Sequence, residues 1–302
     1  MIFKPKKEKK DKLGVFDWVL FAVLVTYSLI LLALLLFGLF SSVNTRTVYN
    51  HKIFFPDGKE WVWAFDNYVK VFSSFVIDNE LLQDGTFGYA NFYSMTVNSF
   101  AYAIGGAFVS VAAYFLAAYA TSKFPNVFSK IVYNFVIVSM VIPIIGATPA
   151  NVVILKSLGL FESMLSVYVM KFNFLGMYFL VFHAIFSSLS KDYAEAASLD
   201  GASEWTIMLK IMLPLVMPTV STIFLIRFIE CWNEYGFVLI YLRSFPTLSY
   251  GVYKMSLENV NGMDHATMRI ASAFLVGIPV ITLFILFRNK IMGNVTMGGV
   301  KE

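Results

Sequence analysis

Three ionisable side chains lie within one apolar stretch of this 302-residue chain. Arg227, Glu230 and Glu234 are separated by three and four positions, which places them on one face of a helix. Ionisable residues inside a membrane are rare and usually face a bundle interior or a water-filled cavity. With Trp232 and Asn233 beside it, this face offers hydrogen-bonding groups and a flat ring to a polar solute. An internal ion pair of Arg227 with either glutamate, fixing helix packing, explains the same pattern equally well.

A further polar residue, Asn151, shares an apolar segment with Pro143 and Pro149. Proline removes a backbone donor and kinks or breaks a helix. In a membrane, broken backbone is tolerated where it is buried in protein or lines a water-filled cavity. We therefore expect a broken or kinked helix here, and we count Asn151 among the candidates for a solute path.

Recognisable patterns for catalysis or metal binding are missing. The three histidines are scattered, and Cys231 is the only cysteine, so neither a metal cluster nor a disulfide is expected. The chain lacks the HExxH or GxSxG pattern of an intramembrane enzyme and the GxxxxGK[ST] loop that holds a nucleotide. We expect no catalytic residue, no metal site and no cofactor on this chain.

The composition is that of an integral membrane protein. Hydrophobic residues make up 58% of the chain and charged residues only 14%, whereas about a quarter of an average soluble domain is charged. Six lysines fall between Lys4 and Lys12, directly before an apolar run. Such a run indicates membrane topology and contact with anionic lipid rather than binding to nucleic acid.

Six apolar segments are long enough to span a bilayer, which takes about 20 residues. They are residues 16–40, 92–120, 131–155, 168–190, 214–240 and 268–288. Basic residues concentrate in the flanks that share a side with the N-terminus, which predicts that both termini lie in the cytoplasm. The 41–91 loop then lies outside, where its aromatic pieces predict a cap of short helices. The predicted fold is all-α with six transmembrane helices.

A compact charged segment, KDYAEAASLDGASEWTIMLKIMLP, interrupts the apolar pattern at residues 191–214. Alanine and glutamate favour a helix up to about Leu199, and Gly201 permits a sharp turn. Ser203 is a candidate N-cap for a second helical piece, and Pro214 is placed where a new helix begins. The second piece carries four apolar residues at helical spacing, predicted to form one face: Trp205, Met208, Leu209 and Met212.

The first helical piece has the properties of a docking element. Ala196 and Ala197 are small enough for close approach to a groove, and Glu195 and Asp200 supply charges that orient the docked helix. An amphipathic helix lying on the membrane surface is the alternative. That alternative gives no reason for the glycine and the proline at these spacings.

The same segment resembles a known family. Glu-Ala-Ala at 195–197, Gly201, and Ile-x-Leu-Pro at 211–214 are similar to the EAA motif of ABC-importer permeases, and DGAS at 200–203 is the form usual in sugar permeases. The C-terminal VTMGGVKE resembles the tail of the maltose-type second permease subunit. Three further short pieces agree in order: VNSF at Val97, MVIP at Met140 and ECWNEY at Glu230.

This resemblance implies a type I ABC importer fold in which the EAA segment is a cytoplasmic coupling helix that docks into an ATPase. It also implies partners: a second permease subunit in a heterodimer, two ATPase subunits that hold ATP and Mg, an extracytoplasmic solute-binding protein and a sugar. The expected location is the cell membrane of a bacterium or archaeon. The resemblance assigns eight residues to ATPase coupling: Glu195, Ala196, Ala197, Asp200, Gly201, Ala202, Trp205 and Pro214.

The chain divides accordingly into four parts. They are a basic cytoplasmic tail (1–15), the first transmembrane helix with its outer loop (16–90), a core permease domain of five helices (91–290, with the coupling helix at 191–213) and a cytoplasmic C-terminal tail (291–302).

Two other transport functions stay open. A permease for a phosphate ester such as glycerol phosphate would want more basic residues in its path than Arg227 alone. An ion-coupled secondary transporter would predict repeated halves, and the sequence shows none. The single basic residue and the lack of repeats both favour an oligosaccharide importer over these two alternatives.

Overall fold

The computed structural model describes residues 14–46, 49, 63–81, 87–142, 146–257 and 265–295. Most of each predicted terminal tail lies outside these residues. So do Pro143 and, within the outer loop, residues 47–62 except for residue 49. Within them the chain is almost entirely helical, with one two-stranded hairpin.

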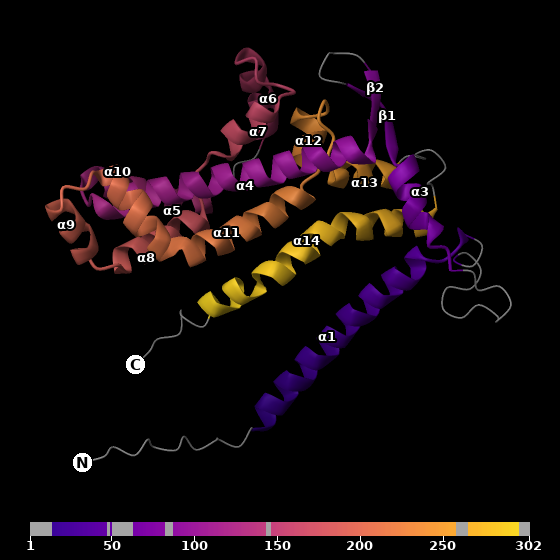
Figure 1. Cartoon of the computed structure of the whole chain (residues 1–302), viewed down its shortest axis with the longest axis horizontal. Helices are drawn as coiled ribbons and strands as arrows, with labels where there is room; N and C mark the ends of the chain where they lie inside the picture. The colour runs from indigo at the N-terminus through magenta and orange to yellow at the C-terminus, as the bar shows by residue number, and fades with distance from the viewer. Residues whose placement is uncertain are drawn as a thin grey trace.

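Four helical stretches are long and apolar enough to cross a membrane: Val15–Ser42, Phe92–Lys123, Glu204–Asn233 and Ala266–Phe287. They correspond to the first, second, fifth and sixth predicted spans. In Figure 1, α11 (Leu213–Asn233) runs from the end that carries α9 (Asp192–Leu199) toward the hairpin. Helix α1 (Val15–Ser42) begins away from that end and also runs toward the hairpin side. The helices α4 (Phe92–Lys123) and α14 (Ala266–Val295) run back.

The predicted third and fourth spans are each broken into two helices. The third consists of α5 (Val127–Val141) and α6 (Ala147–Ser157), which confirms the expected break. The fourth was predicted to be continuous, and this prediction was wrong: α7 (Met164–Lys171) and α8 (Met177–Ser188) are separated by five residues. Gly176 before α8 has φ +148°, a conformation that only glycine adopts readily, so the helix cannot continue through it.

The fifth span also differs from its prediction. No new helix begins at Pro214; one helical stretch runs from α10 (Glu204–Thr206) through the π-helix η1 (Ile207–Met212) into α11. Proline lacks an amide hydrogen and its ring crowds the carbonyl of the preceding turn. The wider π-turn accommodates that defect without ending the helix. The stretch ends at Asn233, and the short α12 (Gly236–Tyr241) follows a break at Glu234.

The outer loop forms more than helices. After α3 (Asp66–Ser74) come β1 (Val76–Leu81) and β2 (Phe87–Asn91), an antiparallel pair in which Ile77 faces Ala90. The all-α prediction is corrected by this hairpin. Near the hairpin, α13 (Leu248–Leu257) packs closely on α4, and a Cβ on Gly251 would stand 2.9 Å from both Met95 on α4 and Phe75, the residue before β1. Only glycine allows this close approach.

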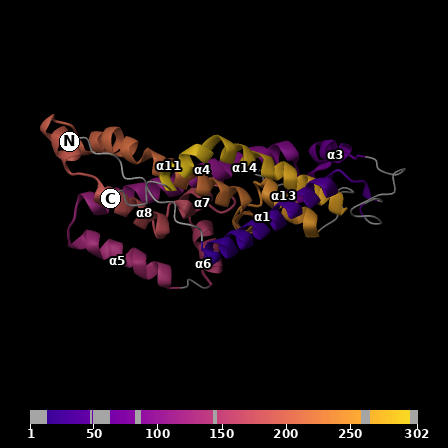
Figure 2. The ribbon, with the colours of Figure 1, turned by 90° about the horizontal axis from the view of Figure 1, so that it is seen from below.

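The interior is divided into two buried clusters along the length of the molecule. The cluster at the hairpin end includes Phe75, Met95, Tyr102, Trp232 and Tyr250. The cluster at the α9 end includes Phe115, Phe182, Phe186, Ile207 and Met212. The helices α4 and α11 run through both and pack along each other, with α8 on α4 and α14 on α11. Figure 2 shows α5 on the opposite side of α4 and α8 from α14.

Helix α1 packs on α14 toward its C-terminal end, where a Cβ on Gly38 would stand 3.0 Å from the ring of Phe274. It is buried only at its last two residues, Ser41 and Ser42, and Figure 1 shows it diverging from α14. Asn67 on α3 donates from its amide to the carbonyls of Ser42 and Asn44, which fixes the end of α1. The long apolar sides of α1 suit contact with lipid or with another membrane helix.

Candidate functional site

Helix α9 is a short helix at one end of the molecule. Asp192 and Glu195 lie in its first turn, where negative charge is favourable to the helix dipole. Ala194 and Ala197 face inward and are buried in the α9-end cluster, whereas Glu195 and Ala196 are exposed. This placement differs from the expectation that Ala196 and Ala197 both face a partner.

The turn after α9 explains the glycine of the motif. Gly201 has φ +80° and no atom within 4 Å of an added Cβ, so the requirement comes from the backbone and not from space. Gly201 N donates to Ser198 O, and Ala202 N to Ala197 O, both at 3.0 Å. These two bonds form a Schellman motif, with Asp200 as the C-cap. The motif thus rigidly ends one helix and redirects the chain into the next.

The segment after the turn begins as predicted and then diverges. Ser203 Oγ accepts from Thr206 N at 3.3 Å, which confirms the N-cap. Met208 and Met212 are buried, but Trp205 is 69% exposed and Leu209 also points outward. The predicted single apolar face is therefore corrected to two faces, because the π-turn changes the angle between successive residues. Pro214, exposed in the first turn of α11, lies well inside the continuous helix.

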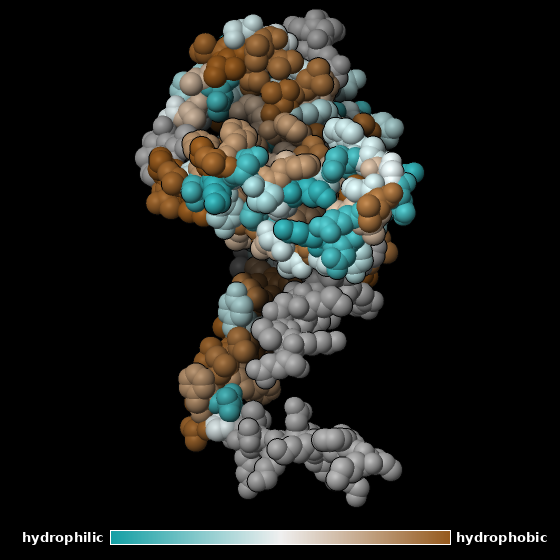
Figure 3. Space-filling view, turned by 90° about the vertical axis from the view of Figure 1, so that its left-hand side faces the viewer, coloured by the Kyte–Doolittle hydropathy of each residue, from teal (hydrophilic) through white to brown (hydrophobic). Residues whose placement is uncertain are grey.

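One surface residue was missed by the sequence reasoning. Leu199, the last residue of α9, is 89% exposed beside the Asp200–Gly201 turn. An apolar residue at the end of a short helix is ordinarily assigned to the buried side, so the pattern gave no signal for it. Figure 3 faces the α9 end and shows hydrophilic residues gathered there with apolar residues among them. This mixed surface suits protein docking better than insertion into lipid.

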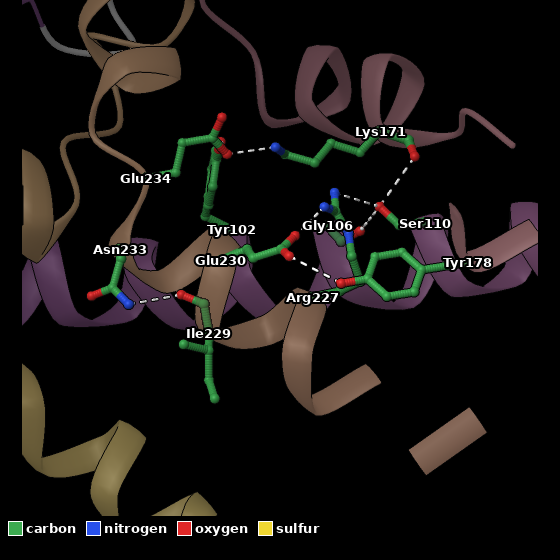
Figure 4. Close-up of polar contacts among 10 residues, drawn as sticks. All are labelled: Tyr102, Gly106, Ser110, Lys171, Tyr178, Arg227, Ile229, Glu230, Asn233 and Glu234. Atoms are coloured by element: carbon green, nitrogen blue, oxygen red, sulfur yellow. Dashed lines mark hydrogen bonds and ion pairs between the residues drawn. The ribbon is translucent and has the colours of Figure 1, made fainter. Parts of the chain in front are cut away.

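A polar cluster lies between the long helices (Figure 4). Lys171, the last residue of α7, places Nζ 2.5 Å from Glu234 Oε2, and Tyr102 on α4 donates to the same oxygen at 2.8 Å. The ammonium lies 5.6 Å from the ring centre of Tyr102 and 5.4 Å from that of Phe237. Two chain breaks, after α7 and after α11, thus meet at one ion pair.

The second half of the cluster surrounds Arg227. Its guanidinium pairs with Glu230 one turn further along α11, and its other terminal nitrogen is 3.4 Å from Ser110 Oγ on α4. Tyr178 on α8 donates to Glu230 at 3.1 Å. Of the two internal pairs considered from the sequence, Arg227–Glu230 is present, while Glu234 pairs with Lys171 instead. The cluster therefore ties four helices together and also leaves Glu230 partly exposed.

Close packing of α7 on α4 depends on a glycine. A Cβ on Gly105 would stand 2.3 Å from the ring of Tyr168, whose hydroxyl donates to Ala101 O at 3.2 Å. On the next position, a Cβ on Gly106 would stand 3.2 Å from the sulfur of Cys231. Small residues at such positions let helices approach closely in a membrane, and here they bring Lys171 within reach of Glu234.

The remaining predicted path residues are separated from one another. Trp232 is buried, its indole donates to Val276 O at 2.9 Å, and it stacks on Phe228, so it packs toward α14 and not beside the charged groups. Asn233 is exposed and donates to Ile229 O within its own helix. Asn151 is half-buried on α6.

Four members of the cluster were missed from the sequence: Tyr102, Ser110, Lys171 and Tyr178. Lys171 carried a usable signal, since a lysine in an apolar segment must find a partner. The two tyrosines had none, because nothing distinguishes them from the other tyrosines among 16 in the chain.

Comparison with known proteins places the chain in a family. Residues 110–292 match the model of the binding-protein-dependent transport system inner membrane component, and the chain belongs to that family. This membership confirms the resemblance found in the EAA segment. The chain is thus a membrane-embedded transport subunit and not an enzyme.

Individual relatives and solved structures agree with this family assignment. The chain is 22% identical over 284 residues to the diacetylchitobiose uptake system permease protein NgcG of Streptomyces coelicolor, covering 92% of this chain and 86% of that one. It is 33% identical over 119 residues to the maltose/maltodextrin transport system permease protein MalG of Yersinia pestis, covering 38% of each. A chain in the crystal structure of a bacterial ABC transporter involved in the import of the acidic polysaccharide alginate has a TM-score of 0.70 at 21% identity, covering 95% and 99%. This last likeness shows a shared fold.

Proposed function

We propose that this chain is one of two permease subunits of an ATP-driven oligosaccharide importer in a bacterial or archaeal cell membrane. Its relatives support a sugar as the solute, since their names specify diacetylchitobiose, arabinooligosaccharides and maltose or maltodextrin. The single observation that carries the proposal is α9 itself: a Schellman-capped helix at one end of the body, with exposed Glu195, Ala196 and Leu199.

In this proposal α9 is the coupling helix. It docks into a groove of an ATPase subunit that holds ATP and Mg, and movement of that subunit is passed through the Gly201 turn. The stretch from α10 to α11 carries the movement onward, because its helix is unbroken from Glu204 to Asn233. This continuous helix ends at the break at Glu234, next to the polar cluster. The helical stretch from Glu204 to Asn233 thereby connects the α9 end with the polar cluster.

The proposed topology has six crossings with both termini in the cytoplasm. The helix pairs α5–α6 and α7–α8 supply the third and fourth crossings. Lys123, Lys191 and Lys210 all lie at or near the α9 end of the helices, which by the positive-inside rule is the cytoplasmic end. The hairpin end is then outside.

The polar cluster is proposed as part of the translocation path, with Arg227, Glu230, Asn233 and Glu234 as the residues carried over from the sequence. A second permease subunit supplies the opposite wall, and an extracytoplasmic binding protein delivers the sugar at the outer end. A chain of similar fold, with a TM-score of 0.58, comes from a bacterial alginate ABC transporter in complex with its pentasaccharide-bound periplasmic protein. That complex supports a binding protein as a partner here.

The test is purification of the tagged chain from its native membrane, followed by sugar-stimulated ATP hydrolysis of the recovered complex. We expect an ATPase and a second permease to co-purify. The variant Gly201→Val should lose coupling, and Gly159→Val is its matched control, because Gly159 also has positive φ (+67°) and open space but lies between α6 and α7. Recovery of the chain alone, or equal loss in the two variants, would contradict the proposal.

A further inference from the structure

We infer that Glu230 and Glu234 make the path selective for glycans without carboxylate groups. Uncharged and amino-bearing oligosaccharides bind there, and uronate oligosaccharides do not. This inference rests on the proposed function and adds the charge class of the solute, with two glutamates as the residues that determine it.

The first observation is an asymmetry of exposure within the two ion pairs. The side chains of Glu230 and Glu234 are 45% and 35% exposed, whereas those of Arg227 and Lys171 are 19% and 11% exposed. Figure 4 shows the side chain of Lys171 extending toward Glu234 and that of Arg227 extending toward Glu230. A solute that approaches the cluster therefore meets carboxylate oxygens before it meets either cation.

The second observation is that both cations are already occupied. Lys171 is held by Glu234 and covered by the rings of Tyr102 and Phe237. Arg227 uses one terminal nitrogen for Glu230 and the other for Ser110, and its Nε, which has no partner among the described residues, is buried and so not accessible to a solute. A uronate would have to displace a glutamate to reach either cation, and the released carboxylate would then lie beside the uronate as a like charge.

No other cation is placed to receive a uronate in this part of the chain. Along α4, α7, α8 and α11, which the structure describes in full, the only other lysine or arginine is Lys123, the last residue of α4 at the α9 end. The one histidine on these helices, His183 on α8, packs against the rings of Tyr133 and Phe179. The strongest recognition of a carboxylate in a protein comes from charge-assisted hydrogen bonds with an available arginine or lysine. This wall of the path does not provide one.

The third observation is an open acceptor. Glu234 binds both Lys171 and Tyr102 through Oε2, which leaves Oε1 without a partner among the described residues. Asn233, beside it, uses its amide nitrogen for Ile229 O and keeps its carbonyl oxygen open. Both acceptors take hydrogen bonds from sugar hydroxyls, and the carboxylate also attracts an ammonium group. The chemistry thus suits hexose and hexosamine units.

The shared fold does not fix the charge of the solute. The related solved structure is a transporter involved in the import of an acidic polysaccharide, and folds host different specificities through the residues grafted on them. Here the grafted residues present negative charge, so the solute of this chain differs in charge class from an acidic polysaccharide.

The experiment measures binding of three sets of trisaccharides, built of hexose, hexosamine or uronate units, to the purified transporter complex in nanodiscs without its binding protein. Omitting the binding protein removes its own selection. We expect uronates to bind at least about tenfold more weakly than the best hexose or hexosamine ligand. The reason is the repulsion between the uronate carboxylate and the exposed glutamate carboxylates. Raising the salt concentration should weaken hexosamine binding and leave hexose binding unchanged.

The decisive variant is Glu234→Gln, which frees Lys171. It should gain uronate binding by about tenfold, whereas the double variant Lys171→Gln/Glu234→Gln removes both charges and should gain none. Asp66→Asn, an exposed carboxylate on α3, is the matched control for the loss of one negative charge. If the Glu234→Gln complex fails to assemble, Glu230→Gln, which frees Arg227, makes the same test.

The outcomes separate the inference from the function on which it rests. Uronates that bind the wild-type complex as tightly as hexoses, or an assembled Glu234→Gln complex with unchanged uronate binding, would overturn the charge selectivity while leaving a sugar importer in place. If no trisaccharide of any class binds, the oligosaccharide function fails and the inference fails with it.

Discussion

Lys171 and Glu234 join two interruptions of the backbone, one after α7 and one after α11, through a contact of 2.5 Å. Neither residue lies in a regular continuous span, and 63 positions separate them. Broken helices in transporters often mark the solute site, because the freed backbone and side chains line a cavity. The same ion pair also holds α7 against α4 and α11, so it combines a packing role with a position in the proposed path.

Removing one member of this pair should cost stability. Lys171→Met leaves Glu234 with only Tyr102 as a partner, and we expect a loss of about 1–3 kcal/mol, since Glu234 is partly solvated. Thermal unfolding of the purified chain in nanodiscs measures it. The double variant Lys171→Met/Glu234→Met should recover most of the loss. Equal stability of the single variant and the wild type would show that the pair contributes nothing to packing.

Packing of α7 on α4 should be sensitive to a single methyl group at Gly105. Gly105→Ala places Cβ about where the ring of Tyr168 now lies, and overpacking of this kind costs roughly 1–3 kcal/mol. Gly277→Ala on α14 is the matched control, because an added Cβ there meets nothing within 4 Å. Thermal unfolding that falls by the same amount in both variants would argue against the close approach.

The exposed Leu199 should contribute to ATPase docking and not to folding. Leu199→Ser removes an apolar side chain that touches little of its own chain, so the unfolding temperature should be unchanged. Loss of a docked leucine should weaken ATPase binding by about tenfold, or roughly 1–2 kcal/mol. Titration of the purified ATPase against the permease complex measures this. Leu257→Ser, at the other end of the molecule and also exposed, should bind the ATPase normally.

Much of the fold follows from the sequence, and the differences have local causes. Apolar length predicts α1, α4, α11 and α14, and Ser203 and Gly201 mark helix ends because capping and positive φ are local requirements. Apolar length cannot show the break between α7 and α8, since the residues around Gly176 remain apolar. The prediction that a new helix begins at Pro214 was wrong because the π-turn before it lets the helix continue, and no local sequence pattern predicts a π-turn.

The candidate site divides in the same way. Arg227, Glu230 and Glu234 are visible in the sequence because charge in an apolar stretch is conspicuous, and their shared face follows from helical spacing. Their partners are not visible. Tyr102 reaches Glu234 across 132 positions, a contact that only tertiary packing creates. Trp232 adjoins these charges in sequence but turns toward α14 because adjacent residues of a helix lie on different faces.

The central claim, that α9 docks into an ATPase through its exposed face, is tested most directly by cysteine cross-linking in native membranes. The native Cys231 is buried, so an added cysteine is the principal accessible thiol. Ala196→Cys lies on the exposed face of α9, and Ala197→Cys, its neighbour, lies on the buried face. We predict that a short bifunctional reagent joins position 196, but not position 197, to an ATP-binding subunit. Cross-linking of neither position, or of both equally, would contradict the coupling role of this helix.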